Sequence, residues 1–144
     1  MKMTKEELAA KLEAHAKWLK TRYTDHVEGE RANLTRADLT DADLTGANLT
    51  DADLTDADLT DADLTDANLT DADLTDANLT RANLTRADLA DADLTDANLM
   101  DADLTDADIE HVWRASTLVW DAISATLSAR IALKKTRIEW EQHK

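Results

Sequence analysis

The sequence predicts a β-solenoid, in which the chain winds into square coils of four pentapeptides each. Residues 32–111 are sixteen consecutive pentapeptides, with Ala first in all sixteen and Leu third in fifteen. A five-residue step fits no regular element. On an α-helix it rotates successive leucines by about 140°, and on a flat strand it sends them to opposite faces. A repeat of this regularity is the feature that organises the chain.

The pentapeptide itself supplies an inward face. Its Ala and Leu lie two residues apart, so a short extended piece points both inward and the intervening Asp or Asn outward. If the next two residues turn the chain by a right angle, four pentapeptides close a square and coils stack about 4.8 Å apart. The expected core ladder consists of Leu34, Leu39, Leu44, Leu49, Leu54, Leu59, Leu64, Leu69, Leu74, Leu79, Leu84, Leu89, Leu94, Leu99, Leu104 and Ile109.

The repeat A-[DN]-L-T-x, as in ANLTDADLTD at residues 67–76, resembles the pentapeptide-repeat family. The resemblance covers residues 31–111 and implies a right-handed quadrilateral β-helix of about four coils, with Ala and Leu inside. The outward positions hardly vary along the chain. This uniformity indicates a consensus-designed or otherwise idealised member.

Residues 1–30 are predicted to form an N-terminal helical cap. Thr4 and Glu7 have the spacing of a capping box, which begins a helix. A solenoid needs its open end covered, and this helix would cover the end of the leucine column. The residues expected to face the column follow at helical spacing and are Leu8, Leu12, His15 and Leu19.

Residues 112–144 are predicted to hold an irregular last coil and a C-terminal helix. The stretch 117–141 lacks Gly and Pro and carries an apolar stripe. Two interpretations stay open: a second cap, or a seam through which two chains form a homodimer. The seam would consist of Val119, Trp120, Ile123, Leu127 and Ile131.

Folding at a period of four pentapeptides places each residue above the one twenty positions earlier, so that the fifth positions form charged columns. Every Arg of the repeats then meets an Asp above or below it, either by selection or by chance among acidic neighbours. The expected charge ladder consists of Arg31, Arg36, Asp51, Asp56, Asp61, Asp66, Arg81, Arg86, Asp101 and Asp106.

The stacked aspartates are expected to repel one another. Like charges opposed in a ladder destabilise it and raise the pKa of the carboxyl groups. Stability would then be higher near pH 5 than near pH 8 at low salt. The same carboxylates could also hold a divalent cation such as calcium, though weakly.

Composition excludes several functions. The net charge of −15 disfavours nucleic acid and anionic membranes as partners. The chain has no Cys and no Gly-rich phosphate loop, and its histidines lie far apart in the sequence. We expect no catalysis and no cofactor. High charge with few aromatics also fits disorder, but sixteen in-register repeats indicate a core.

Two functions remain. The first is a non-catalytic structural scaffold without a natural ligand, located in the cytoplasm because no signal or membrane-spanning segment is visible. The second follows from the family resemblance, since some members are acidic rods that mimic DNA and bind DNA gyrase. Four coils give a height of about 19 Å, short of the ~34 Å turn of B-DNA, which favours the scaffold.

Overall fold

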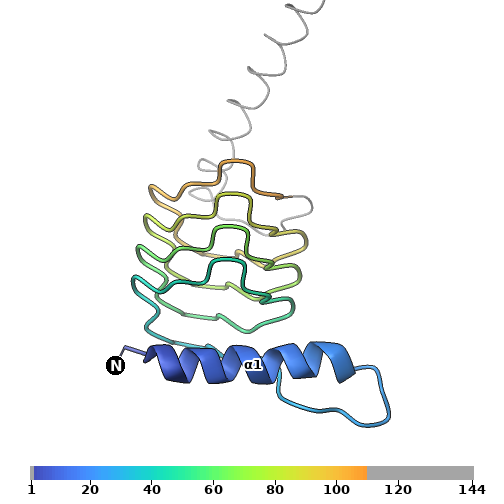
Figure 1. The fold of residues 1–144 in the computed structure, drawn as a ribbon. Helices are drawn as coiled ribbons and strands as arrows, with labels where there is room; N and C mark the ends of the chain where they lie inside the picture. The colour runs from blue at the N-terminus through green and yellow to red at the C-terminus, as the bar shows by residue number, and fades with distance from the viewer. Residues whose placement is uncertain (1, 110–144) are drawn as a thin grey trace, which may run out of the picture.

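The structure is a computed structural model that describes residues 2–109 of the 144-residue chain. It consists of one helix, α1 (Lys5–Thr21), followed by a linker and a stack of square coils. Figure 1 shows α1 lying across the open end of the stack. The predicted C-terminal helix and its seam, together with the last coil after residue 109, lie outside the described residues.

α1 begins at the capping box that the sequence predicts. The Thr4 side chain accepts a hydrogen bond from the Glu7 backbone N–H (3.1 Å), and the Glu7 carboxylate accepts one from the Thr4 N–H (2.8 Å). These bonds satisfy donors that a helix start would otherwise leave unpaired, and the bond from the Thr4 N–H lowers the pKa of the Glu7 carboxyl group. The helix ends at Thr21 and is capped by Arg22, whose backbone N–H donates to the Trp18 carbonyl.

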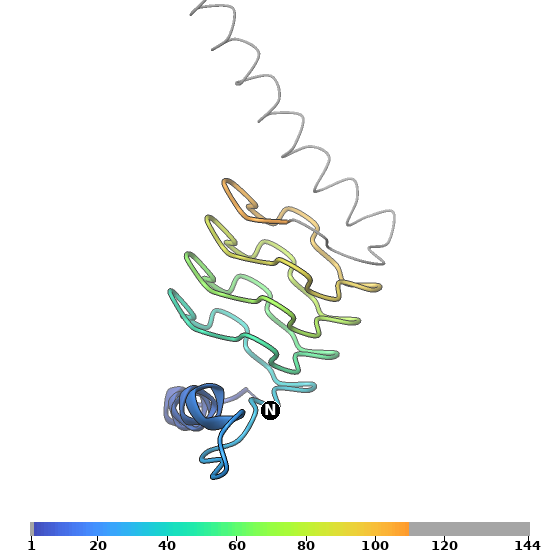
Figure 2. The same ribbon diagram turned by 90° about the vertical axis from the view of Figure 1, so that its right-hand side faces the viewer.

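The coils are held together by parallel pairing at a register of twenty residues. Isolated bridges join Asn33 to Asp53 and continue in the same register to Asp88 and Asp108. Around the bridge between Asn33 and Asp53, the Leu34 N–H donates to the Asp53 carbonyl (2.7 Å) and the Asp53 N–H donates to the Ala32 carbonyl (2.9 Å). Residues 2–109 contain no longer strand because a corner interrupts the extended backbone in every pentapeptide (Figure 2).

Each corner is the same four-residue turn. In one example the Ala57 N–H donates to the Leu54 carbonyl at 3.0 Å, and Asp56, the third turn residue, has a φ of +58°. A positive φ at this position is what a type II turn requires. Asp adopts the left-handed backbone region more readily than most residues do, and Gly adopts it without strain. Both occur at the fifth position, so Asp there serves the backbone as well as solubility.

The core is the leucine column. The leucines from Leu34 to Leu104 are all at most 2% exposed, and Ile109 is partly buried. Burying a leucine contributes about 1.5–3 kcal/mol relative to leaving it exposed. The alanines beside them are mostly buried as well, with Ala42, Ala47 and Ala102 less covered near the two ends. The described chain therefore has one continuous apolar core of Ala, Leu and Ile.

Candidate functional site

The second position of each pentapeptide is tied to its own turn. Asp53 Oδ1 accepts hydrogen bonds from the backbone N–H of Thr55 (3.1 Å) and from its hydroxyl (2.7 Å). The same backbone bond recurs along all four faces, and the hydroxyl bond accompanies it in about half of the pentapeptides. An Asp or Asn side chain that bonds the backbone two residues later forms an Asx turn. These side chains therefore hold corners rather than reaching toward a ligand.

Three arginines of the fifth position pair with the aspartate of a neighbouring coil. Arg81 makes two bonds to Asp61 (Nε–Oδ1 2.8 Å and Nη2–Oδ2 2.5 Å). Arg86 binds Asp66 in the same way (2.7 and 2.6 Å), while Arg36 makes one longer contact with Asp56 (3.3 Å). All three pairs are at least one-third exposed, so they contribute little to stability.

The cap supplies the partner of Asp51. Asp51 was expected beneath Arg31 but instead forms an ion pair with Arg22, which follows α1. The Arg22 guanidinium also lies over the rings of Trp18 (5.0 Å) and Tyr23 (4.8 Å). Repeat spacing could not identify Arg22, because it lies outside the repeats. Its place after the last helical turn, beside two aromatics, was the only available signal.

The aspartate pKa values that shift are all lowered, and they belong to second-position aspartates or to aspartates paired with arginine. The rise expected for the stacked aspartates without an arginine partner therefore stays a prediction. Hydrogen bonds from Thr45 and Thr105 lower the pKa of Asp43 and Asp103. Bonds from Arg81 and Arg86 lower the pKa of Asp61 and Asp66. The fifth aspartate whose pKa is lowered is Asp53.

Burial alone would raise the pKa of Asp53, but hydrogen bonds from Thr55 and Thr35 outweigh it and lower the pKa. In all five aspartates, donors aimed at the carboxylate outweigh the other influences, since a hydrogen bond to the charged form favours that form. The contribution of these five aspartates to stability is therefore lost as the pH falls, which is opposite in sign to the effect expected of the stacked aspartates.

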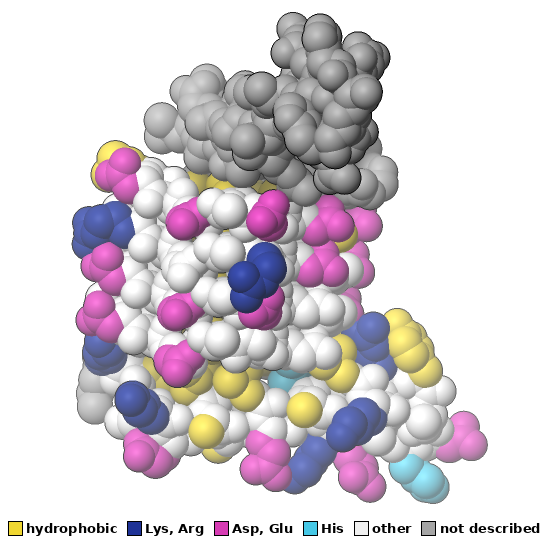
Figure 3. Space-filling view, turned by 45° about the horizontal axis from the view of Figure 1, so that its top comes forward, with side chains coloured by type: hydrophobic (Ala, Val, Ile, Leu, Met, Phe, Trp, Pro, Cys, Tyr) yellow, Lys and Arg dark blue, Asp and Glu magenta, His cyan; other side chains and the backbone are white. Residues whose placement is uncertain are grey.

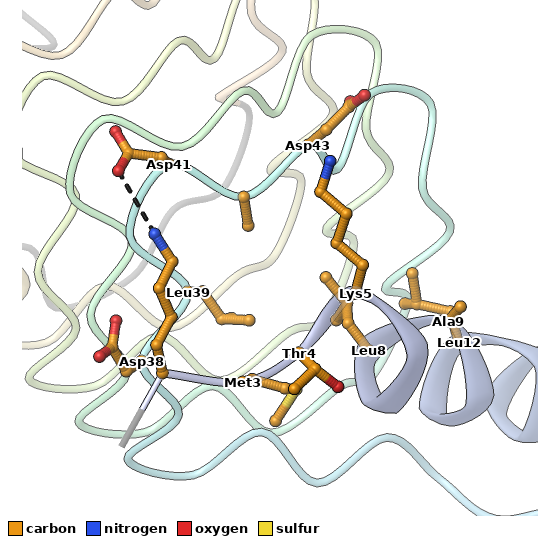
Figure 4. Close-up of a pocket in the computed structure, with 12 residues that line it drawn as sticks. Met3, Thr4, Lys5, Leu8, Ala9, Leu12, Asp38, Leu39, Asp41 and Asp43 are labelled. Atoms are coloured by element: carbon orange, nitrogen blue, oxygen red, sulfur yellow. Dashed lines mark hydrogen bonds and ion pairs between the residues drawn. The ribbon is translucent and has the colours of Figure 1, made fainter.

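A groove lies between the start of α1 and the first coil, with a volume of about 310 Å³. Its lining includes Leu8, Leu12 and Leu39, which Figure 4 labels. Lys2, also part of the lining, forms an ion pair with Asp41 (3.3 Å). The charged residues of the lining nearly balance: two are lysines and three are aspartates, namely Lys2, Lys5, Asp38, Asp41 and Asp43. We interpret the groove as the gap left where a cylindrical helix crosses a square end.

The four faces are similar to one another. Each carries five or six aspartates and at most one arginine among the described residues. On the side of the molecule that Figure 3 shows, several of the aspartates are separated by neutral surface. Residues 2–109 contain no group of three or more His, Asp or Glu side chains that could hold a metal ion. His15 lies in α1 and His26 in the linker after it, and the two other histidines lie outside the described part.

The repeats identify the family. Its profile, described as pentapeptide repeats, matches residues 32–71 and 67–106 with eight copies in all. The chain belongs to the pentapeptide-repeat family. Membership implies a right-handed coil, in agreement with the sequence resemblance. No curated protein sequence matches this pentapeptide-repeat chain.

Solved structures of pentapeptide-repeat proteins show the same fold. HetL from the cyanobacterium Nostoc sp. strain PCC 7120, described as involved in heterocyst differentiation regulation, is 39% identical over 55% of this chain, with a TM-score of 0.54. A second pentapeptide-repeat protein from Nostoc PCC 7120 is 44% identical over 54% of this chain, with a TM-score of 0.53. The matched parts span 37% and 64% of those two proteins.

The described part of this pentapeptide-repeat chain has one further negative property. Across residues 2–109, no helix is both long enough and apolar enough to cross a membrane. The predicted seam residues Val119, Trp120, Ile123, Leu127 and Ile131 lie beyond this range, so the homodimer remains a prediction.

Proposed function

We propose that this chain is a non-catalytic structural scaffold, idealised toward a consensus repeat and without a natural ligand. The observation that carries the proposal is the local use of its polar side chains. Second-position Asp and Asn accept bonds from their own turns, and three arginines bind aspartates of adjacent coils. A binding surface instead relies on a few distinctive side chains in its centre.

Insertion of a coil tests the scaffold directly. A second copy of residues 52–71, inserted after Asp71, adds a full turn and preserves the twenty-residue register. Since a solenoid's stability is close to a sum of repeat and interface contributions, the melting temperature should rise. Small-angle scattering should show a molecule about 4.8 Å longer. Insertion of only one pentapeptide is the matched control, because it moves Arg81 and Arg86 off their partners. Unfolding caused by the full-coil insertion would contradict the proposal.

We also propose that the segment 117–141 joins two scaffolds, through the apolar stripe that its sequence contains. The molecular mass in sedimentation, measured with and without residues 117–144, tests this. A dimer that becomes a monomer on truncation supports the seam, and a monomeric mass for the full chain removes it.

The acidic faces favour one alternative, a DNA mimic that acts on DNA gyrase. Each face carries a strong excess of aspartate, as such a mimic requires. A supercoiling assay separates the two functions. No change in gyrase activity at micromolar protein is expected of a scaffold, whereas inhibition or protection from quinolones would establish the mimic.

A further inference from the structure

His15 lies in the middle of α1, and its side chain is completely buried against the first coil (0% exposed). Within α1, only Leu8 is buried to a similar degree. The Nδ1 atom of His15 accepts a hydrogen bond from the Ala32 backbone N–H at 3.1 Å. Ala32 is the first residue of the first pentapeptide. This bond therefore ties the helix to the point at which the solenoid starts.

This contact fixes the protonation state of the ring. A backbone N–H can only donate, so Nδ1 must carry a lone pair and the hydrogen of the neutral ring lies on Nε2. Nε2 meets no partner with hydrogen-bond geometry among the described residues, although the Thr50 carbonyl lies close enough to influence the ring. A doubly protonated ring would set its Nδ1–H against the Ala32 N–H. The docked helix therefore accommodates the neutral ring alone.

The groups around His15 reinforce this preference. The Trp18 ring stacks on it, with centroids 5.6 Å apart and an angle of 14° between the planes. The charged groups that face it are Arg22 after the helix, Arg31 before the repeats and Asp51 in the first coil. Burial is the largest influence and lowers the pKa of His15, and the two arginines act in the same direction. The Thr50 carbonyl and Asp51 oppose the shift without overcoming it.

We propose that α1 is a pH-released lid on the first coil, held closed by neutral His15 and freed when the ring is protonated. The lid goes beyond the scaffold function and does not depend on it. A histidine with a lowered folded pKa contributes its full docking free energy above its ordinary pKa of about 6.5, and loses it as the pH falls through the folded value. Release would uncover the end of the leucine column, while the Ala and Leu core of the coils contains no titrating group.

The test is a titration of the full-length chain by NMR between pH 8 and pH 5. It follows the His15 ring signals and the backbone amides of α1, of Ala32 and of a central residue such as Leu79. We expect the ring to titrate below about 6.5, its ordinary pKa. The α1 and Ala32 amides should change with the same midpoint, and the Leu79 amide should not change.

Two variants complete the test. His15→Gln removes the titrating ring but keeps an acceptor, and His26→Gln changes an exposed histidine of the linker. We expect the α1 transition to disappear in His15→Gln, whether the lid is then closed or open throughout, and to persist in His26→Gln. A transition that survives in His15→Gln overturns the proposal. So does a ring that titrates without any change in α1, or one that stays neutral until the repeats unfold.

Discussion

Each backbone contact in the repeats recurs in every pentapeptide, whereas each contact between α1 and the first coil occurs once. The corner turn and the twenty-residue register are repeated from Asn33 to Asp108. The cap instead depends on single contacts: the His15 bond to Ala32, the Arg22 pair with Asp51 and the bridge between Lys2 and Asp38. Loss of one contact should therefore weaken a coil slightly but displace the cap.

The largest expected effect is a cavity in the centre of the column. Leu69→Ala removes a side chain that is 0% exposed and belongs to the core cluster of Leu and Ala, and we expect the regular backbone of the coils to keep the cavity open. We expect a loss of about 2–5 kcal/mol in the free energy of unfolding. Urea unfolding followed by circular dichroism measures it.

The matched control for the column is Leu8→Ala in α1. Leu8 is 8% exposed and lies at the edge of the core, where the helix can adjust. Leu8→Ala should lower the free energy of unfolding by less than Leu69→Ala does, and the change should appear only in the signals of the cap. Equal losses that unfold both regions together would show that cap and repeats form one cooperative unit.

Two glycines with positive φ allow the linker after α1 to be compared with a corner of the repeats. In Gly29→Ala the new Cβ would collide with the Ala14 carbonyl, which belongs to the helix backbone and cannot move aside. In Gly46→Ala the Cβ meets nothing within 4 Å, and only the left-handed backbone (φ +64°) opposes it. We expect Gly46→Ala to lower the free energy of unfolding by about 1–2 kcal/mol, which is the cost of the left-handed conformation for a residue with a Cβ. Gly29→Ala should lower it by more. Thermal melting measures both, and the reverse order would contradict the packing of the linker against α1.

Acid should weaken the coils only at low pH. The pKa values of Asp43, Asp53, Asp61, Asp66 and Asp103 are lowered in the folded state. Their contribution is therefore present above the ordinary aspartate pKa of about 3.9 and lost as the pH falls through the lowered folded values. The melting temperature of the repeats should stay nearly constant from pH 8 to pH 5 and fall at lower pH. A melting temperature that is higher at pH 5 than at pH 8 would show that repulsion between stacked aspartates, as expected from the sequence, dominates instead.

The smallest expected effect comes from an exposed ion pair. Arg81→Gln removes the two bonds to Asp61, but both side chains remain well exposed to water. We expect the smallest change of the series, and one that shrinks as salt is added. A double-mutant cycle with Asp61→Asn measures the coupling. A large coupling that persists at high salt would mean that the charge columns hold the coils together.

The periodicity of the sequence predicts the repeats well because every coil solves the same local problem. Ala and Leu spacing indicates the inward face, and Thr4 with Glu7 indicates the start of α1. The Asx turns could also have been predicted, since an Asp or Asn two residues before a Thr is a turn signal. The lowered pKa values could not be predicted from the repeat spacing, because they depend on hydrogen-bond donors that only the fold aims at each carboxylate.

The docking of the cap could not be predicted in this way. It depends on contacts between residues far apart in the sequence, such as His15 with Ala32 and Arg22 with Asp51. Such contacts have no period. Gly29 could be noticed in the sequence, but the reason for a glycine there, the close approach of the linker to Ala14, appears only in the fold.

Hydrogen exchange of the backbone amides, measured at pH 7.5 and pH 5.5, tests the difference between cap and repeats most directly. Protection factors corrected for the intrinsic effect of pH report the opening of each region separately. We predict that α1 loses protection at pH 5.5 while the central coils, from Leu54 to Leu89, keep theirs. Equal protection of α1 at both pH values, or a joint loss in cap and coils, would contradict the account.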